Sequence, residues 1–343
     1  MGVETTRLSG WYRLGLRVQL ALASSVLVAL LAWGQSHLAG RHAAAELEQR
    51  IGAALVDTAQ NLAELLDRAM WSRSGEVRVL ASLSAFRELR VGGEVEEILA
   101  TLQEALPVYT WVGLTDRDGV LLAATGNILV GADISARPVY QEGVQGFFVG
   151  DVHDAKLLAS KLPNPSGEPI QFVDVAAAVR GTDGEVVGVL AAHLSWTWAR
   201  EVQRALFDPA AARRGAELML VGADGSVLLG SEGVDQGQRP ALAGLAQARA
   251  GEAHWRIERW ADGDYLTGYA LADGHMDYPG LGWVVVARQP LHEAFAPAWR
   301  LQSYLLWAGL GMAALFAALA WALADRLVRP LQMLAGEADR LRR

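Results

Sequence analysis

Asp174 and His193 are the two residues of this 343-residue sequence whose types and spacing most directly suggest chemistry. Each stands alone in an apolar run: Asp174 within Ile-Gln-Phe-Val-Asp-Val-Ala-Ala-Ala-Val, and His193 within Val-Val-Gly-Val-Leu-Ala-Ala-His-Leu. Asp183-Gly184 lies between the runs, and an Asp-Gly pair between apolar β-formers is a strong hairpin signal because both turn positions favour φ > 0. A two-residue turn there would place Asp174 directly opposite His193, with Cβ atoms about 4.5–5.5 Å apart.

This carboxylate–imidazole pair has two interpretations. Side chains at that separation are within hydrogen-bonding reach, so the pair could respond to the charge of a ligand or to external pH. It could equally be a satisfied polar pair inside the sheet. A four-residue turn would change the register and place Ala191 opposite Asp174 instead.

A polar, loop-rich segment lies between this hairpin and an earlier one that flanks Asp118-Gly119. It contains Arg137, whose planar guanidinium can bind a carboxylate or phosphate, or could form a salt bridge to Asp133 that fixes the loop. Tyr140 follows three residues later. Strands on both sides of an irregular polar loop favour a small-molecule pocket.

Aromatic and acidic residues are further candidates for the lining of this pocket. Trp111 begins the first strand and is either a pocket wall or a core residue. Phe148, Asp151 and His153 are expected in a loop that lines or covers the pocket. The run Asp151-Val-His153-Asp154 could suggest a metal site, but no other ligand cluster has a fitting spacing, so neither a metal nor another cofactor is expected.

The composition excludes several classes of function. The net charge of −8 argues against nucleic-acid binding, and the absence of cysteine excludes disulfides, thiolate metal sites and cysteine nucleophiles. His292-Glu293 begins a zincin pattern, but position 296 is alanine, and there is no phosphate loop or nucleophile elbow. An enzyme is therefore not expected; a membrane-anchored periplasmic hydrolase remains an alternative that would need a nucleophile and a base.

Two apolar segments, 14–34 and 301–324, are long enough to cross a bilayer as helices. Arginines flank both on the side of the chain ends, which places both ends in the cytoplasm and residues 35–300 outside, in the periplasm of a Gram-negative bacterium. The first segment could alternatively be a cleaved signal peptide. Helical periodicity continues from His37 to about Arg90, with an apolar stripe at 47, 51, 54, 58, 62, 65 and 69, and a second helix, 95–106, ends before Pro107.

An internal repeat indicates two copies of one α+β unit. The strand-turn-strand segment 114–123 is echoed by 220–230, and each is followed by a loop-rich stretch and a later apolar hairpin, at 170–194 and 265–288. The division between the copies is expected near 208–215.

Together these features resemble the double-Cache sensor domains of bacterial transmembrane receptors. The most specific matches are Asp133-x-Ser-x-Arg-Pro-x-Tyr140 and Gly184-x-Val-x-Gly-Val-Leu190, and the tail Arg329-Pro-Leu-Gln-Met-Leu-Ala-Gly-Glu337 resembles the start of a HAMP domain. The resemblance implies an α+β fold with two tandem PAS-like Cache units on a long N-terminal helix, flanked by two transmembrane helices. The implied divisions are a cytoplasmic N-terminus (1–13), transmembrane helix 1 (14–34), stalk and second helix (35–106), membrane-distal ligand unit (107–208), membrane-proximal unit (209–300), transmembrane helix 2 (301–324) and HAMP-like segment (325–343).

The resemblance also implies a function. Many domains of this type bind amino acids through an Arg and an aromatic pair for the carboxylate and an Asp for the amine; Arg137 and Tyr140 match, whereas Val139 replaces the Trp and His193 replaces the Asp. We therefore expect a homodimeric inner-membrane receptor for a carboxylate-bearing small molecule. Its cytoplasmic signalling output would lie in a missing part or in a partner. A dimerising scaffold without a ligand is the remaining alternative.

Overall fold

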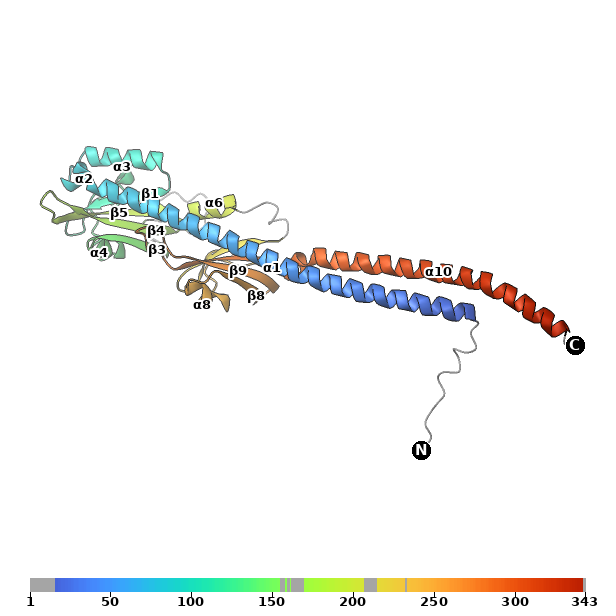
Figure 1. Ribbon diagram of the computed structural model, residues 1–343. Coiled ribbons are helices and arrows are strands. Elements are labelled where there is room, and N and C mark those ends of the chain that lie inside the picture. The colour runs from blue at the N-terminus through green and yellow to red at the C-terminus, as the bar shows by residue number, and fades with distance from the viewer. Residues whose placement is uncertain are drawn as a thin grey trace, which may run out of the picture. The chain divides into compact units, whose positions relative to one another are not determined.

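The computed structural model describes residues 16–154, 158, 161, 170–206, 215–231 and 233–341. Its internal contacts divide the chain into two compact units. One comprises Ile51–Leu291 and the other comprises Met1–Arg50 with His292–Arg343. Every strand that the structure describes belongs to the unit Ile51–Leu291 (Figure 1).

The helical unit contains the first part of α1 (Leu16–Ser82) and α10 (Ala296–Leu341). These segments contact each other: the Ser36 hydroxyl donates a 2.7 Å hydrogen bond to the carbonyl oxygen of Gln302. Small residues let the backbones approach, because a Cβ added to Gly309 would lie 2.2 Å from the Cβ of Ala32.

Both helices of this unit carry long apolar stretches. One lies within Ala21–Ser82 and the other within Ala296–Leu323, and each is long and apolar enough to cross a membrane. Large apolar side chains on both are exposed, among them Leu30 and Trp307. These stretches overlap the predicted spans 14–34 and 301–324, and lipid would cover such side chains.

The larger unit contains two five-stranded antiparallel sheets with the same strand order. The first sheet has the order β2-β1-β5-β4-β3, and its strands are β1 (Tyr109–Thr115), β2 (Leu121–Ala124), β3 (Phe147–His153), β4 (Phe172–Arg180) and β5 (Val186–Ser195). The second has the order β7-β6-β10-β9-β8, and its strands are β6 (Glu217–Val221), β7 (Val227–Leu229), β8 (His254–Trp260), β9 (Gly263–Ala272) and β10 (Trp283–Pro290). The predicted α+β class and the internal repeat are confirmed.

Short helices precede, connect and follow the strands. They are α2 (Ser84–Arg87), α3 (Glu94–Ala105), the 3-10 turn η2 (Thr125–Asn127), α4 (Pro138–Gly143), α6 (Thr197–Leu206), α8 (Gly244–Arg249) and α9 (Leu291–Ala294). Helix α3 matches the predicted helix 95–106, and its end before Pro107 follows from the missing proline N–H. The predicted helix 37–90 breaks between α1 and α2.

The predicted apolar stripe of α1 is only partly correct. Leu62 is buried, but Leu65 is 42% exposed. The face buried in the larger unit contains Leu55, Leu66 and Met70. Apolar residues occur on several faces of this helix, so periodicity alone does not identify the face that packs on a sheet.

The Asp-Gly hairpin between β4 and β5 turns differently from the expectation. The N–H of Gly181 donates to the carbonyl oxygen of Glu185 at 2.8 Å, and Gly184 has a φ of +86°. Three residues, 182–184, therefore form the loop, with glycine in the left-handed position, and the predicted two-residue turn is wrong. A register shift between Val179 and Arg180 compensates for the extra residue, so the register that the shorter turn implied is kept in most of the hairpin.

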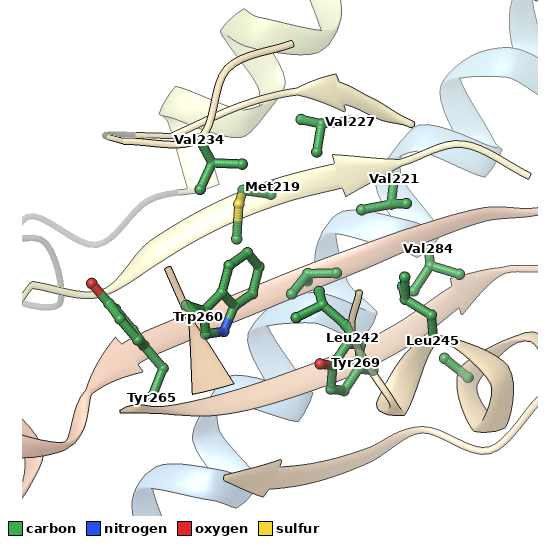
Figure 2. Packing of buried hydrophobic residues seen from close by; sticks show 12 residues of the cluster. Met219, Val221, Val227, Val234, Leu242, Leu245, Trp260, Tyr265, Tyr269 and Val284 are labelled. Carbon is green, nitrogen blue, oxygen red and sulfur yellow. The ribbon is translucent and has the colours of Figure 1, made fainter. Parts of the chain in front are cut away.

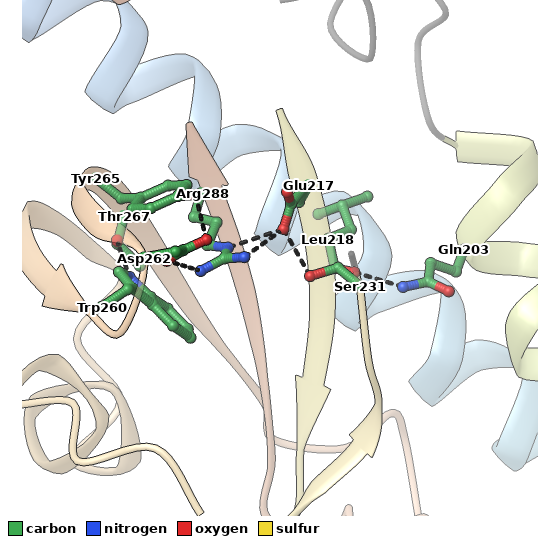
Figure 3. Close-up of polar contacts among 9 residues, drawn as sticks. All are labelled: Gln203, Glu217, Leu218, Ser231, Trp260, Asp262, Tyr265, Thr267 and Arg288. Atoms are coloured by element: carbon green, nitrogen blue, oxygen red, sulfur yellow. Dashed lines mark hydrogen bonds and ion pairs between the residues drawn. The ribbon is translucent and has the colours of Figure 1, made fainter. Parts of the chain in front are cut away.

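The second sheet has a core of aromatic and aliphatic side chains and contains a buried ion pair. Figure 2 shows Trp260, Tyr265 and Tyr269 among the aliphatic residues of this core. The Arg288 guanidinium is completely buried, and its Nε and Nη2 each lie 2.8 Å from one carboxylate oxygen of Glu217 (Figure 3). Its carbon lies over the rings of Trp260 and Tyr265, at 4.3 and 4.2 Å from their centroids.

Asp67 is a buried carboxyl group on the part of α1 that packs in the larger unit. One carboxylate oxygen accepts a 2.9 Å hydrogen bond from the N–H of Gly274, and the other has no hydrogen-bond partner among the described residues. Burial raises the pKa of Asp67 from 3.8 to about 6, against the opposing effect of the Gly274 hydrogen bond. The folded chain therefore binds this proton more tightly than the unfolded chain does.

We predict that Asp67→Asn changes how stability depends on pH. Because the folded pKa lies above the ordinary value, the protonated carboxyl stabilises the fold fully below about pH 4, and this contribution is lost as the pH rises through about 6. The melting temperature of the purified parent should therefore fall as the pH rises from about 4.5 to about 7. Over the same range, the melting temperature of Asp67→Asn should fall less. Asp57→Asn, a change at an exposed residue of the same helix, should show the same pH dependence of the melting temperature as the parent. Parallel profiles of melting temperature against pH for all three proteins would contradict the prediction.

Candidate ligand-binding site

The first sheet borders a cavity of about 640 Å³, within the range of small-molecule sites. Its described lining comprises Trp111, Leu129, Ile134, Arg137, Pro138, Val139, Phe148, Gly150, Asp151, His153, Asp154, Leu158, Asp174 and His193. Seven of the eight candidate residues from the sequence are among them; Tyr140 is not. Sequence reasoning did not anticipate the apolar loop residues, which carry no chemical signal.

Asp174 and His193 are paired across β4 and β5, as the hairpin register predicted. The Nδ1 atom of His193 is in direct contact with the Oδ1 atom of Asp174, although neither atom makes a hydrogen bond of good geometry with a described residue. The rings of Trp111 and Phe172 lie 5.4 and 5.5 Å from the His193 ring, between centroids. The pair is thus held within apolar walls, and the Asp174 side chain is only 9% exposed.

His153 joins this pair from the neighbouring strand. Its Nε2 atom lies 3.6 Å from Oδ2 of Asp174, and its Nδ1 atom lies 3.1 Å from the carbonyl oxygen of Asp151. The expectation that Phe148, Asp151 and His153 lie in a loop is wrong, because they belong to the edge strand β3. An edge strand pairs on one side only and is not buried on alternate faces, so it lacks the period-two pattern that identified the other strands.

Asp151 borders the cavity but is engaged elsewhere. Its Oδ1 atom accepts hydrogen bonds from the N–H of Val152 and from Nε1 of Trp283, both at 2.7 Å. Trp283 belongs to β10, so this carboxylate connects the edge of the first sheet to the second sheet. Asp151 therefore has a structural partner in addition to its place in the lining.

Arg137 immediately precedes α4, where Pro138 at the first helical position fixes the start of the helix. Arg137 is exposed, and no described residue forms an ion pair or hydrogen bond with its guanidinium. Asp133, the expected alternative partner, instead accepts a 2.8 Å hydrogen bond from the N–H of Ser135. Hydrogen bonds from the side chain and then the N–H of Ser135 lower the pKa of Asp133. The guanidinium is thus available to an anion that enters the cavity.

Tyr140 lies one turn further along α4 and faces away from the lining. It is buried, and its hydroxyl donates a 2.6 Å hydrogen bond to the carbonyl oxygen of Arg117. Val139, which stands where the double-Cache pattern has a tryptophan, borders the cavity instead.

The lining combines a few charged and polar groups with apolar walls. Arg137 supplies one cation, Asp174 supplies a buried carboxylate, and aromatic and aliphatic side chains supply the walls. A few polar groups in a mostly apolar cavity are typical of small-molecule sites.

Comparison with known proteins identifies the fold. No protein-family model matches the sequence, and no curated protein matches it. Solved structures do match. The ligand-binding domain of the Pseudomonas aeruginosa PAO1 amino acid chemoreceptor PctC, in complex with GABA, has a TM-score of 0.51 and 16% identity, over 69% of this chain and 99% of that chain.

Two further structures show the same likeness. The ligand-binding domain of the Campylobacter jejuni chemoreceptor Tlp3, in complex with 4-methylisoleucine, has a TM-score of 0.54 and 11% identity, over 72% of this chain and 94% of that chain. The extracellular domain of rpHK1S-Z16, a proposed histidine kinase, has a TM-score of 0.52 and 18% identity, over 69% of this chain and 93% of that chain. The fold is that of extracellular ligand-binding domains of such receptors, as the double-Cache resemblance implies.

Proposed function

We propose that this chain is the sensor portion of a transmembrane receptor that binds a carboxylate-bearing small molecule in the cavity of the first sheet. The observation that carries the proposal is a cavity of about 640 Å³ bordered by an arginine that no described residue pairs with. Structures of the same fold hold GABA and 4-methylisoleucine, both of which carry a carboxylate. The family's amine-binding Asp is replaced by His193, which argues for a ligand other than a common α-amino acid.

The remaining parts of the proposal concern the membrane and the output. The receptor would be a two-pass protein of the bacterial inner membrane, with the sensor in the periplasm and units 107–208 and 209–300 distal and proximal to the membrane. Ligand binding would favour one of two arrangements of a homodimer. The second membrane helix and the HAMP-like segment 325–343 would relay that change to a cytoplasmic output.

The test is a thermal-shift screen of the purified full chain in detergent, with carboxylates, amino acids, amines and purines. All solutions contain EDTA, so that metal ions do not contribute. We expect at least one carboxylate to raise the melting temperature, and Arg137→Ala to weaken its apparent affinity by about 10–100-fold, the effect of losing a charged hydrogen bond of about 1.5–3 kcal/mol.

Arg117→Ala is the matched control, because Arg117 is an exposed arginine in the turn between β1 and β2 and does not border the cavity. It should bind the carboxylate as the parent does. If no compound stabilises the parent, the proposed receptor does not bind these ligand classes, and the result favours a dimerising scaffold without a ligand. If Arg137→Ala binds normally, the assigned role of Arg137 is wrong.

A further inference from the structure

The most unusual feature of the cavity is a cluster of three potential metal ligands on three adjacent strands. His153 on β3, Asp174 on β4 and His193 on β5 each offer one ligand atom, and these atoms all lie within 4.8 Å of one another. Neither the spacing along the sequence nor the double-Cache pattern indicates such a site. It arises because β4 pairs with β3 on one side and with β5 on the other.

The separations fit a small cation. With metal–ligand distances of about 2.0–2.2 Å, two ligand atoms of a tetrahedral site lie roughly 3.3–3.6 Å apart. Nε2 of His153 and Oδ2 of Asp174 are already 3.6 Å apart. His193 and Asp174 are closer than this, so a cation between them would replace their direct contact.

The buried atoms lack a good partner without a cation. Asp174 is buried, and its Oδ1 atom and Nδ1 of His193 make no hydrogen bond with a described residue despite their contact. A buried carboxylate oxygen without a hydrogen bond is costly. Coordination of a cation would satisfy both atoms at once.

The surroundings of the two imidazoles resemble those of metal-binding histidines. Nδ1 of His153 lies 3.1 Å from the carbonyl oxygen of Asp151, a contact that holds the proton on Nδ1 and leaves the lone pair of Nε2 directed at Asp174. The rings of Trp111 and Phe172 restrict the orientation of His193. Ordered imidazoles lose little freedom when a metal binds.

From this geometry we propose that His153, Asp174 and His193 bind a divalent transition-metal ion of the Zn²⁺ class. Two imidazole nitrogens and one carboxylate oxygen suit Zn²⁺, Co²⁺ or Ni²⁺ and disfavour Mg²⁺ and Ca²⁺, which prefer oxygen ligands. Three protein ligands leave a coordination position open. All three residues border the cavity, so that position is accessible to a molecule inside it.

The test is metal binding to the purified, tag-free full chain after treatment with EDTA and its removal. We expect one equivalent of Zn²⁺ in competition with a chromophoric chelator, and Co²⁺ should give the visible absorption of a four- or five-coordinate site. His153→Ala and Asp174→Asn should each weaken Zn²⁺ binding by at least about 100-fold, since even outer-shell partners are worth about 10–100-fold. Mg²⁺ should not compete.

His254→Ala is the matched control. His254 lies on β8, the edge strand of the second sheet, and its Nδ1 is 2.9 Å from the carbonyl oxygen of Glu252, as His153 is with Asp151. It belongs to no ligand cluster in the part of the chain that the structure describes. The His254→Ala variant should bind Zn²⁺ as the parent does. Melting curves should show that each variant folds. His153 is half-exposed, so His153→Ala is the variant expected to fold as the parent does.

The outcomes separate this inference from the proposed receptor function. If the folded parent binds no Zn²⁺ or Co²⁺, or if His153→Ala binds as the parent does, the metal site is refuted, whatever the carboxylate screen in EDTA shows. If Zn²⁺ binds at the three residues and no carboxylate stabilises the chain, the metal site stands and the proposed ligand class fails.

Discussion

Replacing Arg288 with alanine is expected to destabilise the second sheet by about 3–5 kcal/mol. Arg288 is fully buried, and both its Nε and its Nη2 contact Glu217, whose side chain is only 19% exposed. Alanine would leave that carboxylate without its cation. It would also remove a planar group that fills the space between two aromatic rings.

Unfolding of the purified chain by urea, followed through tryptophan fluorescence, measures this effect. Arg259→Ala is the control: Arg259 pairs with Asp264 at 2.8 Å, but the two side chains are 77% and 46% exposed, so the change should cost less than about 1 kcal/mol. A double variant, Glu217→Gln with Arg288→Met, should recover most of the loss because it leaves no unpaired buried charge. Asp262, the other carboxylate beside Arg288 at 3.5 Å, is 49% exposed and stays solvated. Equal midpoints for Arg288→Ala and Arg259→Ala would contradict the argument.

The pairing of Asp174 with His193 could be predicted because two kinds of information agreed. Both strands are apolar except at these positions, and a one-residue slip would move every side chain to the other face of the sheet. The predicted two-residue turn is wrong, since the loop between β4 and β5 has three residues. The register survived because a bulge near the turn absorbs the extra residue.

The third member of the cluster, His153, could not be placed from the sequence. It lies on an edge strand whose residues are all partly or fully exposed, so no apolar periodicity distinguishes the strand from a loop. The contact with Asp174 depends on the pairing of β3 with β4, across which a register shift occurs between Gly150 and His153. Ligands that come from three strands have no characteristic spacing in the sequence.

Tyr140 shows a second limit of the sequence. The double-Cache pattern couples it to Arg137, and both do belong to the start of α4. Arg137 is the N-cap residue, however, and its backbone is extended, with φ −87° and ψ 141°. The helical rule that places residues three apart on one face therefore does not apply to this pair. Arg137 borders the cavity while the Tyr140 hydroxyl reaches the carbonyl oxygen of Arg117.

Trp111→Ala is expected to cost about 3–5 kcal/mol, the usual loss when a buried tryptophan is removed. The side chain is 2% exposed, and its Nε1 donates a 3.1 Å hydrogen bond to the carbonyl oxygen of Ile128. Its ring also packs on the backbone of Gly113, where an added Cβ would lie 2.4 Å away. Trp71→Ala, a change at a tryptophan that is 36% exposed, should cost only about 1 kcal/mol.

The same tryptophan is both core and cavity wall, so the two roles have to be separated by a gentler change. Trp111→Phe keeps an aromatic ring against His193 but loses the donor to Ile128, and it should cost about 1–2 kcal/mol in urea unfolding. If Trp111 contributes to binding as a cavity wall, Trp111→Phe should lower the affinity for the carboxylate or for Zn²⁺ more than Trp71→Phe does. Both affinities are measured at temperatures where the two variants are fully folded. Unchanged binding would assign Trp111 to the core alone. The cavity would then owe its shape to the sheet, and its selectivity to Arg137 and the three-strand cluster.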